Sequence, residues 1–216
     1  MQFAASLSVA DSVVDPKGYY QNNVVGTLSL LGAMVAESVD RLVFSSTAAI
    51  YGNPIETPIF EDHPKNPINS YGETKLAIER ALQHYDRAYG LKSICLRYFN
   101  ASGADPDGLL GENHEPETHL IPRALDAASG GPPLEIFGDD YETPDGTCLR
   151  DYIHVTDLAS AHVLALRCLE GGCDSTAYNL GNGKPYSVKE VVEVVSQVTN
   201  KTVPCVVSPQ RPGDPA

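Results

Sequence analysis

Apolar side chains in the first part of the chain recur at the spacing of a helix with one broad buried face. Val24, Leu28, Leu31 and Val35 repeat at intervals of three and four residues, which predicts a helix over residues 20–37. The run is long enough to cover part of a sheet, and we expect it to do so.

A short apolar run and a second amphipathic segment follow this helix. Residues 41–46 (RLVFSS) predict a buried strand that ends in small hydroxyl-bearing residues. Residues 73–89 predict a helix that Gly90 ends, and residues 92–98 predict a second strand. Because strand, helix and strand alternate at this spacing, the pattern favours a parallel sheet with crossover helices.

The pattern weakens after Asn100. Residues 101–118 hold mostly Gly, Pro, Asp, Glu and Asn, and they predict a long functional loop. The shorter elements that follow predict a small α/β lobe beside the sheet. They are a helix over 119–129, a strand over 134–137, a helix over 157–169 capped by Thr156, a helix over 188–199 opened by a capping box at Ser187, and a strand over 202–207.

Both ends of the chain fall inside elements of this pattern. Phe3-Ala4-Ala5 has the character of the end of a strand, and residues 210–216 stop within a loop. We therefore expect the chain to be a fragment of a longer protein.

The amino-acid composition limits the classes of protein to which this chain can belong. The 216 residues carry 28 acidic and 15 basic side chains, a net charge of −13, which disfavours nucleic-acid and membrane-surface binding. No apolar run approaches the ~20 residues that span a bilayer, and the first residues lack a basic signal-peptide region. The five cysteines form no C-x-x-C pair, so we expect buried, reduced thiols in a cytoplasmic protein.

The segment Tyr71-Gly72-Glu73-Thr74-Lys75 carries the first candidate chemistry. Residues four apart at the start of a helix share one face. A lysine ammonium near a phenol favours the phenolate and lowers its pKa toward working pH, so Tyr71 could act as a general acid or base. The alternative is an exposed tyrosine and a solvated lysine, because the Y-x-x-x-K pattern alone often arises by chance.

Hydroxyl side chains end the first predicted strand, at Ser45-Ser46-Thr47. Taken alone, this run fits a turn or a helix cap. In a parallel sheet, however, ligands bind at the carboxyl ends of the strands, where these hydroxyls would meet Tyr71 and Lys75. The combination resembles the extended short-chain dehydrogenase/reductase superfamily.

Four longer motifs narrow the resemblance to the UDP-glucose 4-epimerase family. Segments similar to its pattern also occur at 19–24 and 178–181, so the resemblance covers nearly the whole chain. The four motifs are FSSTAAIYG at 44–52, NSYGETK at 69–75, LRYFNASGA at 96–104, and the block from Gly138 to Asp157 that contains DGT and RDYIHV.

The resemblance implies an α/β fold, the C-terminal half of a doubly wound Rossmann sheet with a smaller α/β substrate lobe. Residues 1–104 would form a partial NAD-binding domain, from its fourth strand onward. Residues 105–216 would be mostly the UDP-sugar lobe, with about 151–170 returning to the Rossmann domain.

The resemblance also implies individual roles. Tyr71 would exchange the proton of the sugar C4 hydroxyl, Lys75 would tune Tyr71 and bond the nicotinamide ribose, and Thr47 would hydrogen-bond the same hydroxyl. The implied cofactor-binding set is Phe3, Asn22, Ser45, Tyr71, Lys75 and Tyr98, and the implied substrate-binding set is Thr47, Asn100, Leu120, Phe137, Arg150, Arg211 and Asp214.

The implied activity is the interconversion of UDP-glucose and UDP-galactose through a 4-keto sugar, with NAD recycled. The family pairs the helices predicted at 20–37 and 73–89 across a dimer two-fold, so a homodimer is expected of the full-length protein. No metal is expected, because the acids near 112–117 lack a ligand set of proper spacing and favour a solvated loop. His119 could contact the nucleotide or simply begin a helix, and His114 and His162 receive no role.

Some features depart from the family pattern. The glycine-rich turn that holds the NAD pyrophosphate does not occur in these residues, and Leu7 replaces a lysine of some members. Three alternatives stay open: an epimerase of another nucleotide sugar, a dehydratase, and an inactive fragment with residual nucleotide-sugar binding. A dehydratase would need carboxylates where this chain has Ala48 and Ala49.

Overall fold

The computed structural model describes residues 1–211, which divide into two compact units. The first unit holds Met1–Phe99 and Asp157–Leu180, and the second holds Asn100–Thr156 and the residues from Gly181 onward. The sequence-based boundaries, at 104 and at about 151–170, differ from these by several residues.

A parallel sheet forms the centre of the first unit. Its strands lie in the order β1 (Arg41–Thr47), β2 (Lys92–Tyr98) and β6 (Thr176–Leu180). Gln2 forms a parallel bridge to Phe44 on the free edge of β1. Residues 3–5, predicted as the end of a strand, are in no strand, and the expected α/β class with a parallel sheet is confirmed.

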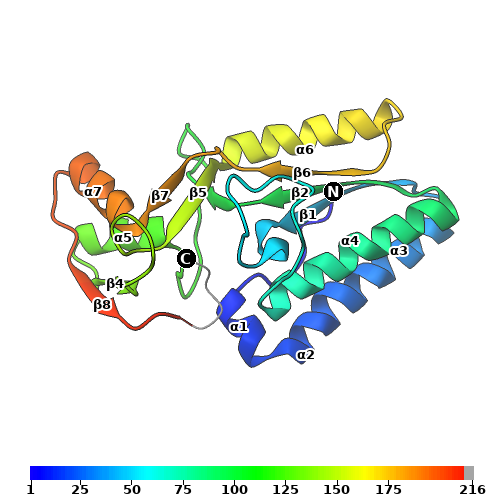
Figure 1. Ribbon diagram of the computed structural model, residues 1–216. Helices are drawn as coiled ribbons and strands as arrows, with labels where there is room; N and C mark the ends of the chain where they lie inside the picture. The colour runs from blue at the N-terminus through cyan, green and yellow to red at the C-terminus, as the bar shows by residue number, and fades with distance from the viewer. Residues whose placement is uncertain (212–216) are drawn as a thin grey trace. The chain divides into compact units, whose positions relative to one another are not determined.

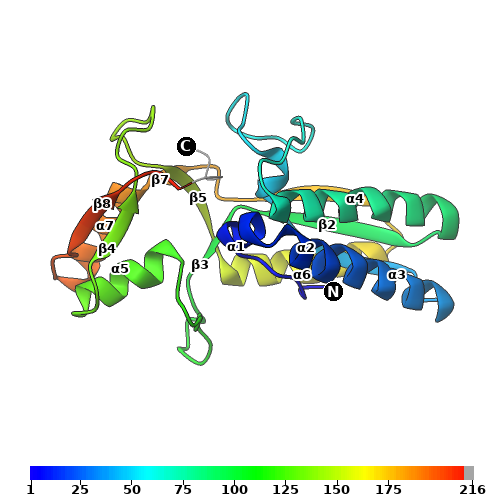
Figure 2. The same cartoon turned by 90° about the horizontal axis from the view of Figure 1, so that it is seen from below.

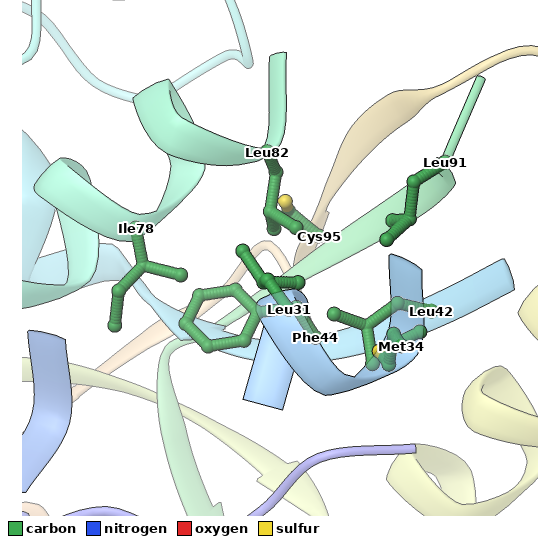
Figure 3. Close-up of a cluster of buried hydrophobic side chains, with 8 residues drawn as sticks. All are labelled: Leu31, Met34, Leu42, Phe44, Ile78, Leu82, Leu91 and Cys95. Atoms are coloured by element: carbon green, nitrogen blue, oxygen red, sulfur yellow. The ribbon is translucent and has the colours of Figure 1, made fainter. Parts of the chain in front are cut away.

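Helices cover both faces of this sheet (Figure 1). Leu42 and Phe44 of β1 point toward α3 (Gly26–Ala36) and α4 (Ser70–Tyr89), because alternate residues of a strand face opposite sides. Val43 points the other way and packs with residues of α6 (Val155–Glu170). The core under α3 and α4 is shown in Figure 3 and consists of Leu31, Met34, Leu42, Phe44, Ile78, Leu82, Leu91 and Cys95.

The helix predicted over 20–37 is more complex than expected. The segment is a π-helix, η1 (Tyr20–Val25), followed by α3, and it is preceded by α1 (Val9–Val14) and α2 (Pro16–Tyr19), which were not predicted (Figure 2). The apolar spacing does not distinguish a π-turn from an α-turn. Helix α2 begins with Pro16 at its first position. The Asp15 side chain caps this helix by accepting a hydrogen bond from the Gly18 amide.

Helix α4 begins three residues earlier than the sequence predicts. Asn69 Oδ1 accepts a hydrogen bond from the Gly72 amide at 2.9 Å, which caps the first turn at Ser70. Gly90 ends the helix in the left-handed conformation, as predicted. The shift places Tyr71 inside the first turn. A short 3-10 helix, η2 (Ala48–Tyr51), follows β1 and was not predicted.

The second unit contains two small sheets. In the first, β5 (Leu149–His154) lies between β3 (Asn100–Ser102), which is parallel to it, and β7 (Pro185–Ser187), which is antiparallel. The second pairs β4 (Leu134–Phe137) with β8 (Cys205–Ser208). Helices α5 (Leu120–Ala128) and α7 (Val188–Thr199) pack together around a core of Ala124, Ala127, Ala128, Leu134, Val191, Val195 and Val203.

Two helix starts were predicted from capping residues in this part of the sequence, and one of the two predictions is confirmed. The capping box at Ser187 is present, with Glu190 as its partner. Thr156 does not cap α6, because the helix already begins at Val155 and the Thr156 hydroxyl pairs with His154 Nδ1 at 2.7 Å. The strand predicted over 202–207 is β8, and β3 lies at the start of the predicted loop.

The expectation that all five cysteines are buried, reduced thiols is wrong. Cys168 and Cys173 form a disulfide, because the chain reverses after α6 and the Cys173 amide bonds the Cys168 carbonyl at 3.1 Å. Cys205 lies exposed on β8, and only Cys95 and Cys148 are buried thiols. Among residues 1–211, no helix combines the length and the apolar run that crossing a bilayer requires.

A buried ion pair ties α4 to the sheet. Arg97 on β2 meets Glu79 on α4 through two hydrogen bonds, Nε to Oε1 at 3.0 Å and Nη2 to Oε2 at 2.7 Å. Arg97 also donates to the Tyr51 hydroxyl at 2.8 Å, and Ser46 donates to Glu79 at 2.6 Å. Burial alone would lower the pKa of Arg97, but the hydrogen bonds and the charge of Glu79 raise it.

We expect Arg97→Met to lower the free energy of unfolding by about 3–5 kcal/mol, because it leaves the Glu79 carboxylate buried without its charge partner. The double variant Arg97→Met/Glu79→Leu should recover much of that loss. Denaturant unfolding of the single and double variants measures both effects. Equal losses in the two variants would contradict a coupled pair, and Asp174→Asn at an exposed pair is the control.

Candidate active site

The predicted hydroxyl and phenol meet where β1 ends and α4 begins. Thr47 is the last residue of β1, and its Oγ1 accepts the Ala49 amide at 3.2 Å, which begins η2. The Thr47 side chain lies close enough to the Tyr71 hydroxyl, from the first turn of α4, to lower the pKa of the phenol. The structure therefore brings Thr47 and Tyr71 together, as their positions in the sequence predict.

Lys75 lies one turn after Tyr71 and is buried, with 3% of its surface exposed. Its Nζ donates to the Ser45 carbonyl at 2.8 Å and lies 5.8 Å from the centre of the Tyr71 ring and 5.0 Å from that of Phe44. Burial lowers the pKa of Lys75 to about 8. This ammonium is therefore unusually easy to deprotonate.

The expectation that Lys75 lowers the pKa of Tyr71 is wrong for the chain by itself. Burial raises the pKa of Tyr71, and the nearby Thr47 side chain opposes this only in part. Lys75, whose Nζ lies 5.8 Å from the centre of the Tyr71 ring, does not outweigh this effect of burial. A phenolate at Tyr71 would therefore need a further positive charge or hydrogen-bond donor.

A second tyrosine, Tyr98 at the end of β2, extends the site. Its hydroxyl lies near the Ser45 side chain, which lowers the pKa of the phenol, and 2.6 Å from Nε2 of His162 on α6. His162 Nδ1 lies 2.8 Å from the Leu158 carbonyl, which only accepts, so Nδ1 carries the proton and Nε2 accepts from Tyr98. Burial raises the pKa of Tyr98 to about 12, so the hydroxyl stays protonated. Tyr98 is a fixed hydrogen-bonding group.

His162 is a site residue to which the sequence analysis gave no role. It is buried on α6, and its ring centre lies 4.7 Å from that of Phe3, one of the expected cofactor contacts, with the two rings tilted by 31°. The sequence offers no sign of this contact because 159 positions separate the two residues. Phe3 itself is 59% exposed.

Asn22, the remaining expected cofactor residue in the first unit, lies exposed on the π-helix η1 and donates to Ser6 Oγ at 3.1 Å. Its neighbour Asn23 is fully buried and was not singled out from the sequence. Asn23 exchanges two hydrogen bonds with the backbone of Ser6 and donates to Thr74 of α4. Asn23 thus holds the segment after Phe3 against the helix that carries Tyr71.

The other expected substrate residues lie in the second unit, apart from Thr47. Asn100 donates to the Asp151 carbonyl at 2.8 Å, and Arg150 Nη1 donates to the Leu149 carbonyl at 2.7 Å. The Arg211 guanidinium lies 3.8 Å from the centre of the Phe137 ring. Arg211 and Phe137 therefore meet, as a shared pocket would require.

Leu120 and Asp214 complete this expected set. Leu120 is the first residue of α5 and packs half-buried on the core between α5 and α7. Asp214 lies outside the described residues.

Fold and site together define a class: an α/β protein with a parallel sheet and a Ser/Thr, Tyr and Lys constellation at the carboxyl ends of its strands. Comparison with known families agrees, because residues 1–181 match the NAD dependent epimerase/dehydratase family. The chain belongs to this family.

Individual relatives are similar along the whole chain. A UDP-glucose 4-epimerase of Halalkalibacterium halodurans is 55% identical and one of Azospirillum brasilense is 52% identical, each over 100% of this chain. The chain spans 65% and 62% of the lengths of these two relatives, which is less than two thirds of either.

Solved structures of similar proteins share the fold. A UDP-glucose 4-epimerase from Brucella ovis in complex with NAD superposes with a TM-score of 0.94 at 54% identity, over 99% of this chain and 66% of that one. One from Bifidobacterium longum in complex with NAD⁺ and UDP has a TM-score of 0.92 at 40% identity, over 99% of this chain and 65% of that one.

Because the pKa of Lys75 is lowered, the free energy of unfolding should depend on pH. The folded pKa of about 8 lies below the ordinary 10.5, so between these values the unfolded chain binds more protons and stability rises with pH. Lys75→Met removes this dependence. We therefore compare the free energy of unfolding of the Lys75→Met variant with that of the parent at two pH values. The advantage of the variant should be about 2–3 kcal/mol larger near pH 7 than near pH 10.

Urea unfolding of both proteins at the two pH values measures the difference. Lys201→Met, at an exposed lysine after α7, is the matched control and should show no such change. A constant difference between the Lys75→Met variant and the parent would show that Lys75 keeps its ordinary pKa.

Proposed function

We propose that the protein is a UDP-glucose 4-epimerase that interconverts UDP-glucose and UDP-galactose with recycled NAD. The observation that carries the proposal is the contact between Tyr71 and Thr47 beside the buried Lys75, one acid/base group and one hydroxyl held at the same strand end. Relatives named UDP-glucose 4-epimerase at 50–55% identity support the choice of reaction.

In this proposal Tyr71 exchanges the proton of the sugar C4 hydroxyl. Thr47 hydrogen-bonds the same oxygen and fixes its position relative to the phenol. Because burial raises the pKa of Tyr71, the phenol is protonated in the chain alone and can act as a base only after gaining a positive charge in addition to that of Lys75. Substrate oxidation and proton removal are thereby coupled to the arrival of that charge.

The residues at this end of the sheet fit a nicotinamide cofactor. A buried, cationic Lys75 beside Tyr71 can bond ribose hydroxyls, and the exposed Phe3 and Asn22 with Ser45 and Tyr98 offer ring and hydrogen-bonding contacts around it. Bound NAD would accept a hydride from the sugar and return it. The chain's own part is to hold the cofactor beside Tyr71, and His162 positions Tyr98 for this task.

Residues of the second unit would bind the UDP moiety. Guanidinium groups pair with phosphate in two-pronged geometry and retain their charge, which suits Arg150 and Arg211 to the diphosphate. The Phe137 ring under Arg211 and the apolar Leu120 would border the nucleotide. Asn100 and Asp214 are proposed contacts of the same substrate. In this scheme the first unit carries NAD and the second carries the sugar nucleotide.

The site argues against a dehydratase. That reaction needs an additional acid and base next to the hydroxyl, and the two residues after Thr47 are Ala48 and Ala49 in η2. Their methyl groups cannot transfer protons. An epimerase acting on another UDP-sugar shares every group named above, so the assay must compare sugars directly.

We further propose that the protein is cytoplasmic and that the full-length form is a homodimer. Val25 and Leu28, three residues apart on the segment that forms η1 and α3, are 47% and 37% exposed and suit a partner helix. Light scattering of the complete protein tests the dimer.

We expect Tyr71→Phe to reduce turnover of UDP-galactose by ~10²–10⁴-fold in the complete protein, with UDP binding nearly unchanged, because it removes the proton-transferring hydroxyl and keeps the ring. Coupled assay of UDP-glucose formation measures this. Tyr89→Phe, at an exposed tyrosine of the same helix, is the control and should keep parental turnover. Near-normal turnover of the Tyr71→Phe protein would exclude Tyr71 from the reaction.

Arg150→Ala should weaken UDP binding by about 10–150-fold, the worth of a hydrogen bond to a charged group, about 1.5–3 kcal/mol. Isothermal titration calorimetry with UDP measures the loss. Arg41→Ala, at an exposed arginine of β1, should bind UDP like the parent. An unchanged dissociation constant for Arg150→Ala would assign this arginine to structure alone.

A further inference from the structure

The loop between β3 and α5 contains a short repeat that the proposed reaction does not use. The sequence Glu-x-His occurs twice five residues apart, as Glu112-Asn113-His114 and Glu117-Thr118-His119. In the structure the loop folds back, so that both copies face one point. One potential ligand atom from each of the four side chains lies within 4.8 Å of the other three.

The spacing of these atoms is that of a metal-binding group. Glu112 Oε1 lies 3.0 Å from His114 Nδ1, and His119 Nδ1 lies 3.2 Å from Glu117 Oε1. His114 Nδ1 is 3.6 Å from Glu117 Oε2, and His119 Nδ1 is in close contact with Glu112. Ligands about 2.0–2.2 Å from a tetrahedral Zn²⁺ lie about 3.3–3.6 Å from one another. The four atoms therefore need only small adjustments to surround one ion.

The chemistry of the four ligand atoms indicates which metal ion suits the site. Two imidazole nitrogens with two carboxylate oxygens suit Zn²⁺ and similar transition metals, whereas Mg²⁺ and Ca²⁺ prefer oxygen alone. The two carboxylates supply two negative charges to balance a divalent cation. Both glutamate side chains are about three-quarters buried, at 25% and 23% exposure, so they are not simply solvated.

Backbone hydrogen bonds already orient one of the ligands. Glu117 Oε1 accepts the amides of Thr118 and His119 at 2.7 and 2.8 Å. Support of this kind reduces the freedom a ligand loses when a metal binds. His119 is also the residue just before α5, and its side chain makes no cap hydrogen bond there.

We propose that Glu112, His114, Glu117 and His119 bind one Zn²⁺ ion, which would clamp this loop to the start of α5. The site is structural, with four protein ligands, and it lies directly before Leu120. The acids of this loop, taken without the two histidines, predict a solvated loop. The competing explanation is a pair of His–Glu ion pairs that holds no metal.

Zinc binding to chelator-treated protein separates the two explanations. All proteins carry Cys205→Ser, because an exposed thiol would bind Zn²⁺ independently. Titration with ZnCl₂ should give one site per chain, and His114→Gln and Glu117→Gln should each weaken it by more than about tenfold. Co²⁺ should give the absorption of a tetrahedral complex, and MgCl₂ should not compete.

Two matched variants complete the test. Glu115→Gln alters the same loop outside the ligand set, and His84→Gln removes an exposed histidine of α4, so both should bind Zn²⁺ like the parent. Absence of a stoichiometric site, or equal binding by His114→Gln and the parent, would overturn the proposal in favour of ion pairs.

Discussion

The buried Arg97–Glu79 pair is the contact on which the geometry of the candidate site depends. Two charges removed from water are tolerated only when their hydrogen bonds are nearly ideal, so the pair permits little sliding or rotation of α4 against β2. Tyr71, Lys75 and Glu79 are spaced four residues apart on one face of α4. A helix fixed at Glu79 therefore also fixes the ammonium and the phenol, one and two turns away, relative to the strand ends.

Much of this arrangement could be predicted from the sequence, because it depends on local periodicity and short spacing. The strands at 41–46 and 92–98, the helix ended by Gly90 and the capping box at Ser187 are each encoded within a few residues. The convergence of Thr47 with Tyr71 follows from the rule that ligands bind at the carboxyl ends of parallel strands. The individual cofactor and substrate roles stay predictions.

The features that could not be predicted depend on contacts between distant segments or on burial. His162 reaches Tyr98 across 64 positions, and the disulfide partners meet only because a turn follows α6. The pKa of Tyr71 was misjudged because burial, which a sequence does not display, outweighs a neighbouring charge. The Glu-x-His repeat was visible in the sequence, but its histidines are brought to the glutamates only by the fold of the loop.

The discontinuous first unit has a consequence for synthesis on the ribosome. Strand β2 pairs with β6 between Ile94 and Thr176, so one edge of β2 waits for 82 further residues to be translated. The second unit supplies most of those residues and emerges in between. Until α6 leaves the exit tunnel, the apolar side of the sheet that it covers stays open to water, and the edge of β2 stays unpaired until β6 follows. Nascent chains that stall in this interval would present an unpaired strand edge, the kind of surface that chaperones recognise.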